Sequence, residues 1–452
     1  METEREIIEM MRAAAPPGQP GLGGDAVAKL QNLTASLISA KGGAGEEYAR
    51  FQAITQRSLC LPEALLNDWL RGAVILVTGG TGCIGSMLMA QLAELGPGRL
   101  VSVSRGVATG NPRIPGAEYL QADIRDRERL DTLIRDIRPD LVFHVAAQRS
   151  PALAEIEVHR TVSTNVLGTR NVLAAAADAG VPQVVCASTG KALRPYSPDM
   201  YAASKRAAEW IAATSSHGEM RISAGRFTHV VDNSIVLHRL YDWARGDQGA
   251  VVRLHSSEIA FYIQSALESA QLLLIAGLGA VRGAFRIHAI TDLGWPVSLL
   301  DLAVGLLADT GSASPIYFSG YDKGYEEISF PGLYDPLTAG EVSPLLNAFE
   351  AARVTEAPCH MVDAFPLEMR PDPEPAKLLA ALEDACAETE DPDTIRGALD
   401  ELSWSLLDVT LQAAPTQTLA RSAAFADPHR AGLSPEHQRL LAAIRRDAGL
   451  DD

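Results

Sequence analysis

A tyrosine and a lysine four residues apart form the most specific chemical motif in this chain of 452 residues. Tyr201 and Lys205 lie in a helical pattern, where residues four apart share one face, so the Lys205 ammonium can lie beside the Tyr201 phenol. A nearby positive charge lowers the pKa of a phenol and makes it an accessible general base. We therefore expect Tyr201 to move a proton at a hydroxyl or keto group, with an exposed pair of no function as the alternative.

Hydroxyl and amine groups precede this motif at the end of an apolar run. Ser188 and Thr189 end the run Gln183–Thr189, and a hydroxyl there would position the oxygen of a substrate. Lys191 follows in a chain that has 33 arginines and only six lysines, so its titratable ammonium can be the reason that it is a lysine. A catalytic base, a cofactor contact and a solvated surface lysine all remain open for Lys191.

A glycine-rich loop joins an apolar strand to a helix and is suited to hold a phosphate group. Gly79 would make the tight turn, Gly82 would let the backbone approach a pyrophosphate, and Gly85 would let the helix pack on the strand. Because a strand precedes the loop and a helix follows it, a mere tight turn is the weaker interpretation. We expect dinucleotide contacts from Thr78, Gly79, Thr81, Gly82, Cys83, Ile84 and Gly85.

The residues after the next strand favour a cofactor with a 2′-phosphate. An acidic residue that would bind a ribose hydroxyl is missing there, and Ser104 and Arg105 occupy the position. A guanidinium suits a phosphate, so we expect NADP rather than NAD, with a solvated Arg105 as the alternative. Asp123 could accept a hydrogen bond from the adenine amino group or cap a helix. Further expected cofactor contacts are Ile124, Ala146, Ala147 and Lys205.

These residues lie at the ends of short apolar strands that alternate with helical stretches. Strands are expected at 73–80, Arg99–Ser104, Leu141–Ala147 and Gln183–Thr189. Such alternation predicts βαβ units, and hence an α/β fold with a Rossmann-type doubly wound parallel sheet. We expect a helical N-terminal extension at 1–71, a dinucleotide-binding domain at 72–230, a smaller substrate-binding subdomain at 231–335 and a mostly helical C-terminal extension at 336–452.

Composition excludes several classes of protein. Hydrophobic residues make up 47% and charged residues 21% of the chain, which is typical of a globular protein. A net charge of −17 argues against binding to nucleic acid or to an anionic membrane surface. The five cysteines lie far apart, no metal-binding spacing is present, and no secretory signal or membrane span is visible. We expect a cytoplasmic protein that acts on a small molecule, binds no metal and forms a homo-oligomer, most simply a dimer.

Together these motifs resemble the extended short-chain dehydrogenase/reductases. TGGTGCIG is similar to their TGxxGxxG loop, and Tyr201 with Lys205 is similar to their YxxxK pair. VFHVAAQRSP, TNVLGTRNVLAAAADAGV, STGKALRP and YAASKRAAE resemble the polysaccharide-biosynthesis branch, which contains UDP-N-acetylglucosamine 4,6-dehydratases. The resemblance covers roughly residues 73–330. It implies that Asn165 supports the backbone of the active site and that Gln148, Asn165 and His229 lie at the substrate.

The chain departs from that branch where substrate and leaving group would be bound. The branch has STDK at the end of the fourth strand, and its acid protonates the departing hydroxyl, whereas this chain has Gly190 before Lys191. Asp199 is a candidate replacement acid. His229 stands where the branch has an asparagine for the diphosphate, and Asp322 stands where it has an arginine. A family TRYF segment reads Ala260 to Ile263 here, so an ordinary UDP-sugar is in doubt unless the alignment is shifted in this half.

Three functions remain open on the sequence. The first is an NADP-dependent oxidoreductase acting on a hydroxyl or keto carbon of a sugar-like compound or secondary metabolite, with Tyr201 as general acid/base. The alternative is a nucleotide-sugar 4,6-dehydratase or epimerase. A further alternative is a cofactor-bound scaffold without catalysis, which the presence of both Tyr201 and Lys205 disfavours.

Overall fold

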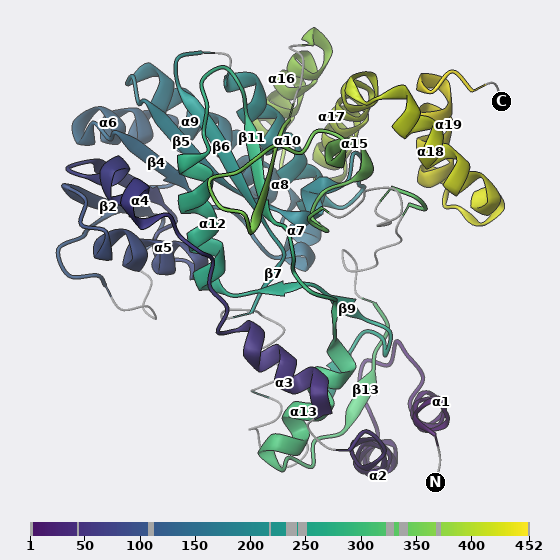
Figure 1. Cartoon of the computed structure of the whole chain (residues 1–452). Coiled ribbons are helices and arrows are strands. Elements are labelled where there is room, and N and C mark those ends of the chain that lie inside the picture. The colour runs from purple at the N-terminus through teal and green to yellow at the C-terminus, as the bar shows by residue number, and fades with distance from the viewer. Residues whose placement is uncertain are drawn as a thin grey trace. The chain divides into compact units, whose positions relative to one another are not determined.

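The computed structural model of the chain describes residues 3–42, 45–106, 113–216, 218–231, 242, 251–321, 330–333, 342–367 and 372–450. These residues belong to two compact units, each made of segments that are distant in sequence. The first unit comprises Met1–Ser58, His229–Ala266 and Leu293–Glu326. The second comprises Leu59–Thr228, Leu267–Asp292 and Glu327–Asp452. Figure 1 labels the elements of both.

The second unit is built on an eight-stranded sheet with the order β14-β11-β6-β5-β4-β1-β2-β3. All neighbours are parallel except β11 and β14, which are antiparallel. The order β3-β2-β1-β4-β5-β6 is the doubly wound Rossmann arrangement, in which a ligand crevice opens where the strand order reverses, between β1 and β4. The strands are β1 (Val74–Thr78), β2 (Arg99–Ser104), β3 (Glu118–Gln121), β4 (Leu141–His144), β5 (Gln183–Thr189), β6 (Arg221–Phe227), β11 (Arg286–Ile290) and β14 (Val362–Pro366).

Helices pack on this sheet and connect its strands (Figure 1). They are α4 (Glu63–Leu70), α5 (Cys83–Glu94), α6 (Arg127–Ile137), α7 (Pro151–Ile156), α8 (Val158–Val162), α9 (Gly168–Asp178), α10 (Met200–Ser215) and α12 (Ala266–Leu278). One turn of π-helix, Ser163–Leu167, precedes α9, and one turn of 3₁₀-helix, Gly190–Leu193, follows β5. Because β1, β4 and β5 are buried on both faces, they are continuous apolar runs and could be recognised in the sequence.

The C-terminal residues form helices that belong to the same unit. They are α15 (Ala348–Ala351), α16 (Pro373–Glu388), α17 (Pro392–Ala413), α18 (Thr416–Ala426) and α19 (Pro435–Asp447), with a 3₁₀ turn at Asp427–Gly432. Helix α17 packs directly against α10 (Figure 1). A hydrophobic core that includes Leu407, Leu411, Leu419 and Ile444 holds these helices together. The expected helical C-terminal stretch therefore covers the helix that carries Tyr201.

The first unit combines the N-terminal helices with short strands from the middle of the chain. Its helices are α1 (Glu4–Ala14), α2 (Gly24–Ala40), α3 (Gly45–Ile54) and α13 (Leu299–Thr310). Its strands are β7 (His229–Val230), β8 (Val252–Leu254), β9 (Ala260–Phe261), β10 (Ile263–Gln264), β12 (Val297–Ser298) and β13 (Ile316–Phe318), paired as β7 with β10, β8 with β13 and β9 with β12.

The N-terminal helices are an integral part of this unit. Leu30 and Leu37 of α2 are fully buried in one core with Val304 and Ile316. Burying each such side chain contributes about 1.5–3 kcal/mol. The Thr34 hydroxyl also accepts a hydrogen bond from the Ile316 amide at 2.9 Å.

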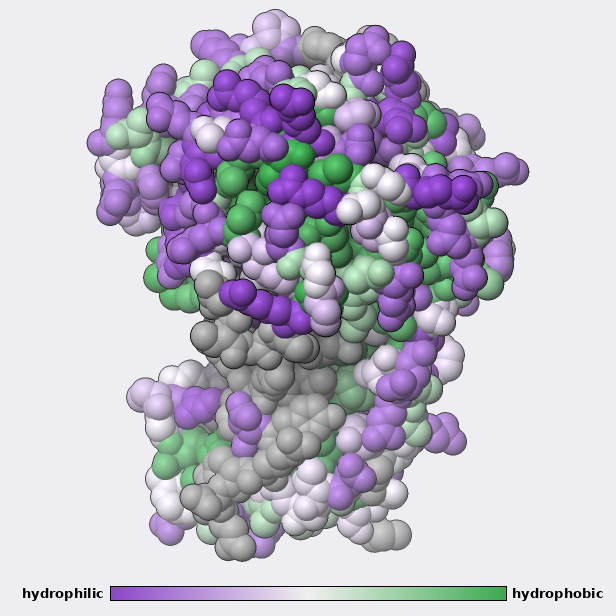
Figure 2. Space-filling view, turned by 90° about the vertical axis from the view of Figure 1, so that its left-hand side faces the viewer, coloured by the Kyte–Doolittle hydropathy of each residue, from purple (hydrophilic) through white to green (hydrophobic). Residues whose placement is uncertain are grey.

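The surface carries hydrophilic and hydrophobic residues side by side. Figure 2 shows one face, on which polar residues dominate and apolar residues lie between them. Among the residues that the structure describes, no helix combines the length and the apolar character needed to cross a membrane.

Candidate active site

The glycine loop between β1 and α5 is shaped for close backbone approach. Gly79 has a φ of +75°, and a Cβ there would lie 2.7 Å from the Ala146 nitrogen. A Cβ on Gly85 would lie 2.1 Å from the Gly79 carbonyl oxygen, so only glycine lets α5 begin against the turn. Gly82 precedes the first residue of α5 and contributes no side-chain cap. The amides of this helix N-terminus are therefore suited to a pyrophosphate, and the loop fits a dinucleotide.

Thr78 supports this loop through a buried histidine. The Thr169 hydroxyl donates to the Asn165 carbonyl at 2.7 Å, so at 3.0 Å it accepts from Nε2 of His144. Nδ1 of His144 then accepts from the Thr78 hydroxyl at 2.8 Å. Burial, with a smaller contribution from the Lys205 charge, lowers the pKa of His144 to about 3. His144 is therefore a neutral residue that fixes β1 against α9.

The cofactor-selecting residues gather at the ends of β2 and β3. The Thr81 hydroxyl donates to Ser104 at 3.0 Å, which ties the glycine loop to the end of β2. Arg105 is exposed, and its backbone oxygen accepts from the Gln121 side chain at 2.9 Å. Burial acts to raise the pKa of Asp123, but hydrogen bonds from Arg125, together with the charges of Arg125 and Arg105, lower it.

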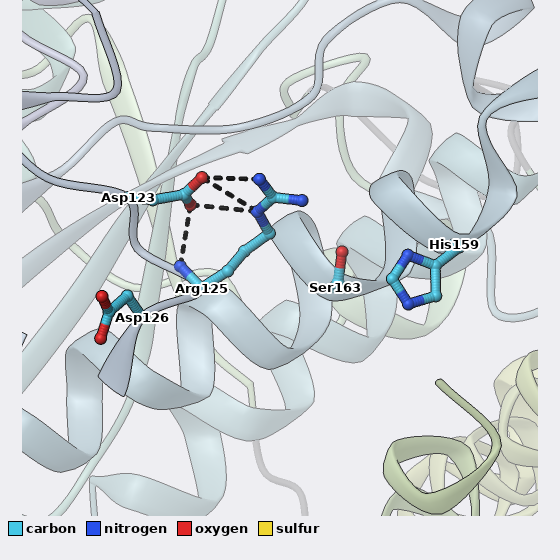
Figure 3. A pocket seen from close by; sticks show the side chains of 5 residues that line it. All are labelled: Asp123, Arg125, Asp126, His159 and Ser163. Atoms are coloured by element: carbon cyan, nitrogen blue, oxygen red, sulfur yellow. Dashed lines mark hydrogen bonds and ion pairs between the residues drawn. The ribbon is translucent and has the colours of Figure 1, made fainter. Parts of the chain in front are cut away.

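A pocket of about 340 Å³ opens beside these residues (Figure 3). In Figure 3 the Asp123 carboxylate faces the Arg125 guanidinium, which donates to it from Nη2 at 2.7 Å and from Nε at 3.0 Å. Helix α6 is capped by Asp126, whose side chain accepts from the Arg129 amide, so the helix-cap role considered for Asp123 is wrong. The pocket is lined by Asp123, Arg125, Asp126, His159 and Ser163.

The other expected cofactor contacts lie around the same crevice. Ala146, in the loop after β4, donates its amide to Thr78 at 3.4 Å, and Ala147 follows it. Cys83 and Ile84 are half-buried in the first turn of α5. Ile124 is buried and closely faces Gly168 of α9.

Tyr201 and Thr189 come together at the carboxyl end of β5. The two side chains share a hydrogen bond, which lowers the pKa of the Tyr201 phenol as the charge of Arg149 does. Burial is the larger effect, however, and it raises the pKa of Tyr201. The expectation that a neighbouring cation brings this pKa below its usual value is therefore wrong for the chain alone.

Lys205 lies one helical turn further along α10. Its Nζ donates to the Ala187 carbonyl of β5 at 2.8 Å, and burial lowers its pKa. The lysine is thus fixed against the strand that ends in Thr189.

Ser188 faces away from this group. Its hydroxyl donates to Glu209 at 2.6 Å, because successive side chains on a strand point to opposite faces. Glu209 belongs to a buried ion cluster in which Arg226 binds both Glu209 and Glu350 at 2.7 Å, and Arg206 binds Glu350 at 3.1 Å. The structure pairs Tyr201 with Thr189 and holds Lys205 against the Ala187 carbonyl of the same strand, whereas it places Ser188 in this cluster.

Lys191 is not a solvated surface lysine. It lies in the 3₁₀ turn after β5, where its amide donates to Thr189 at 3.3 Å. Burial, with a smaller contribution from the charge of Arg194, lowers the pKa of Lys191 to about 8. Its amine is therefore partly neutral near physiological pH, as a general base requires.

Neither Gly190 nor Asp199, the two positions considered for a proton donor, offers an unpaired acidic side chain. A Cβ on Gly190 would lie 2.8 Å from a methyl group of Leu345, so an acidic side chain there would have to displace Leu345. The Asp199 carboxylate accepts from the Arg194 guanidinium at 3.0 Å.

Asn165 supports the backbone after β4. Its Oδ1 accepts from the Gln148 amide at 2.8 Å, and its Nδ2 donates to the Gln148 carbonyl at 3.0 Å and to the Ser204 hydroxyl at 3.1 Å. It lies in the π-helical turn, a distortion frequent at functional sites. Asn165 thus connects the loop containing Gln148 to α10.

The remaining expected substrate residues belong to the first unit or are not described. His229 begins β7, and its ring lies 4.8 Å from that of Phe261 in β9. Asp322 lies outside the described residues. Within the described ranges, no His, Cys, Asp and Glu side chains are grouped as a metal site would need.

Sequence reasoning missed three charged residues close to the site. The charge of Arg149 lowers the pKa of Tyr201, and Glu209 accepts a hydrogen bond from the Ser188 hydroxyl. Glu155 binds the first amide of α10. Arg149 directly precedes Ser150 and Pro151, a cap-plus-proline signal for the start of α7, and Glu155 lies within the same short helix. That signal could have drawn attention to them.

The sheet order and the glycine loop are those of the Rossmann fold of the extended short-chain dehydrogenase/reductases. The chain belongs to the family described as polysaccharide biosynthesis protein, whose model matches residues 75–330, more than half of the chain. The expected resemblance is confirmed.

The chain is also similar to individual proteins of polysaccharide and nucleotide-sugar biosynthesis. A capsular polysaccharide biosynthesis protein of Staphylococcus aureus is 29% identical over 287 residues, which are 59% of this chain and 47% of that protein. A UDP-N-acetylglucosamine 4,6-dehydratase (inverting) of Campylobacter jejuni is 32% identical over 167 residues, 35% of this chain and 49% of that enzyme. The chain spans about half the length of these curated relatives.

A solved structure supports the fold. The protein Pen of Bacillus thuringiensis aligns with a TM-score of 0.55 and 22% identity, over 66% of this chain and 87% of that one. The expected Rossmann-type fold is confirmed.

Proposed function

We propose that the chain is an NADP-dependent enzyme that modifies the sugar of a nucleotide-sugar, beginning with oxidation of a sugar hydroxyl to a ketone. The observation that carries this proposal is the Thr189–Tyr201 pair with Lys205 at the carboxyl end of β5, in the same parallel sheet whose strand β1 ends in a loop that fits a dinucleotide. The chain's family supports the sugar-nucleotide class. The relatives favour the dehydratase or epimerase alternative over action on a secondary metabolite, and they give the scaffold alternative no support.

Thr189 and Tyr201 would hold the reacting oxygen. The Thr189 hydroxyl orients it, and Tyr201 takes its proton as the carbon–hydrogen bond breaks or returns the proton when a ketone is reduced. When bound, the nicotinamide supplies the acceptor and donor of the hydride. Because burial raises the pKa of Tyr201, the neutral phenol is well suited to donate a proton to a ketone.

Arg105 supports the choice of NADP. It follows β2 directly and is exposed. A cation therefore stands at the position where an acidic residue would repel a 2′-phosphate. Its charge acts on Asp123, so it lies close enough to the adenosine side of the crevice to attract a phosphate.

The step after oxidation divides two candidate reactions. A dehydratase removes water next to the new ketone, and the partly neutral Lys191 could take the proton from that carbon. An epimerase returns the hydride to the other face of the ketone, so that the product sugar has the same mass as the substrate. Gly190, packed against Leu345, provides no acid for the departing hydroxyl, which favours epimerisation.

Product analysis tests the proposal. NADP-loaded protein is incubated with UDP-N-acetylglucosamine, and the sugar is analysed by mass spectrometry and NMR. We expect an altered configuration at unchanged mass, while loss of one water would establish the dehydratase alternative. An unchanged sugar, with binding of neither UDP-N-acetylglucosamine nor UDP in calorimetry, would contradict the substrate class.

A further inference from the structure

The helix that carries Tyr201 lacks the cap that its own sequence could provide. Asp199 precedes α10 and is a residue type that commonly caps a helix, yet its side chain makes no capping hydrogen bond. Its carboxylate instead accepts from Arg194 at 3.0 Å. The first amides of α10 therefore need partners from elsewhere in the fold.

Glu155 supplies one such partner from α7. Its Oε1 accepts from the Met200 amide at 2.8 Å, immediately before Tyr201. The Glu155 side chain is 4% exposed, so its charge is almost fully removed from water. A carboxylate at a helix N-terminus is stabilised by the helix dipole, but a buried one also needs a cation.

Arg396 of α17 is that cation. Its Nη1 donates to Oε2 of Glu155 at 2.7 Å, and its Nη2 donates to the Glu155 carbonyl at 3.2 Å. The two bonds fix both the side chain and the backbone of Glu155. A chain of contacts thus runs from the C-terminal helices through Arg396 and Glu155 to the start of α10.

The same face of α17 also contacts the segment before α10. Arg396, Asp400 and Trp404 are spaced four residues apart, so they share one helical face. The Tyr196 hydroxyl donates to Asp400 at 2.7 Å, and its ring stacks on Trp404 with centroids 3.9 Å apart. This face therefore makes two contacts with Tyr196, in the segment between Thr189 and Tyr201.

We propose that Arg396 and Glu155 are positioning residues, through which the C-terminal helices fix the start of α10 and hence the Tyr201 phenol against Thr189. The effect on catalysis rests on the proposed role of Tyr201 as acid/base, whereas the effect on the helix does not. Loss of Arg396 removes two hydrogen bonds and a cation from the buried Glu155, so its carboxylate holds the Met200 amide less firmly and the first turn of α10 loosens. Misplacement of a catalytic group by about 1 Å can cost up to about a hundredfold in rate.

The test compares Arg396→Met and Arg396→Lys in the NADP-loaded full chain. Arg170→Met is the matched control, because Arg170 of α9 forms an ion pair with Glu383 of α16 and so also ties the C-terminal helices to this unit, through a different pair of helices. Hydrogen exchange of the amides 200–203 reports on the helix start. Reduction of the nicotinamide on mixing with UDP-N-acetylglucosamine reports on catalysis.

We expect Arg396→Met to accelerate exchange at 200–203 by about tenfold or more and to lower kcat by about tenfold, with KM changed by less than about twofold. In Arg396→Lys the exchange rate at 200–203 and kcat should lie close to the wild-type values. In Arg170→Met both quantities should equal those of the wild type. The proposal would be overturned if Arg396→Met had the exchange rate and kcat of the wild type. It would also be overturned if Arg396→Met and Arg170→Met changed these two quantities equally. If Arg396→Met does not fold, Glu155→Gln, which keeps the acceptor for Met200 and weakens the ion pair, must show accelerated exchange.

The two proposals fail in distinguishable ways. A wild-type protein that does not reduce its nicotinamide with UDP-N-acetylglucosamine contradicts the proposed substrate. Accelerated exchange in Arg396→Met would still support the positioning contact. Unchanged exchange, with normal reduction in the wild type, would contradict the positioning contact alone.

Discussion

At the scale of single residues, Tyr201 is controlled by opposing effects. Burial raises its pKa, while the hydrogen bond from Thr189 and the charge of Arg149 lower it. The spacing of Tyr201 and Lys205 predicted the helix face that they share, but the Ala187 carbonyl that holds Lys205 could not be identified from spacing.

Arg105 decides between the two nicotinamide cofactors in this account. Arg105→Ala removes a cation expected at the 2′-phosphate, so the affinity for NADP should fall about tenfold, or about 1.4 kcal/mol, while that for NAD stays within about twofold. Calorimetric titration with both cofactors measures this. Arg99→Ala is the control, since Arg99 lies at the other end of β2 in an ion pair with Glu118. Equal losses for NADP and NAD would refute the NADP assignment.

Lys191 predicts how a base-dependent step varies with pH. Burial lowers its pKa to about 8, so the reactive neutral amine increases as pH rises toward 8 and is the main form above it. In the dehydratase reaction, where Lys191 would be the base, the rate of deuterium uptake from solvent into the substrate carbon next to the ketone should therefore rise up to about pH 8 and then level. Lys191→Arg keeps a charge that does not titrate in this range and should abolish the uptake. A pH-independent rate in the wild type would exclude Lys191 as the base.

At the scale of elements, the sequence predicted the strands and the glycine loop of the candidate dinucleotide site. The apolar runs ending at Thr78 and Thr189 are strands because both faces are buried, and Gly79, Gly82 and Gly85 follow the first of them. The two-residue strands, such as β7 at His229, are too short to show an alternation of apolar and polar residues, so they could not be predicted from the sequence. The helical pattern of α17 was visible, but its contact with α10 was not, because pairing of distant amphipathic helices leaves no local signal.

Gly85 tests the loop as an element. Gly85→Ala places a Cβ 2.1 Å from the Gly79 carbonyl oxygen, so the turn and the start of α5 must shift. We expect dinucleotide affinity to fall by at least about a hundredfold, measured by titration of the cofactor. Gly397→Ala is the control: it lies within α17 with open space around its Cβ, and alanine there should stabilise the helix by about 0.5–1 kcal/mol without affecting the cofactor. Unchanged affinity in Gly85→Ala would contradict the role of the loop.

At the scale of the whole molecule, distant segments complete each unit. The N-terminal helices share a core with the segment around α13, and the C-terminal helices pack on α10. Four buried charges, Arg206, Glu209, Arg226 and Glu350, connect α10 and β6 to α15. Sequence alone gives each charge a solvent-exposed position by default, so this cluster could not be predicted.

Glu350→Ala tests how firmly the C-terminal helices are attached. Arg226 is fully buried and would lose one of its two carboxylates, so the free energy of unfolding should fall by about 3–5 kcal/mol. Chemical denaturation followed by circular dichroism measures this loss. Asp68→Ala, which breaks the exposed ion pair with Arg71, should cause no measurable change. Equal stability of Glu350→Ala and wild type would show that the cluster does not hold the C-terminal helices.

The most direct test of the central claim is transient reduction of the nicotinamide. NADP-loaded wild type and Tyr201→Phe are mixed with UDP-N-acetylglucosamine, and the absorbance of the reduced ring is followed. We expect reduction in the wild type and a rate at least about a hundredfold lower in Tyr201→Phe, with NADP affinity unchanged. Equal rates in the two proteins would remove Tyr201 from the mechanism, and no reduction in the wild type would contradict oxidation of a nucleotide-sugar hydroxyl as the first step.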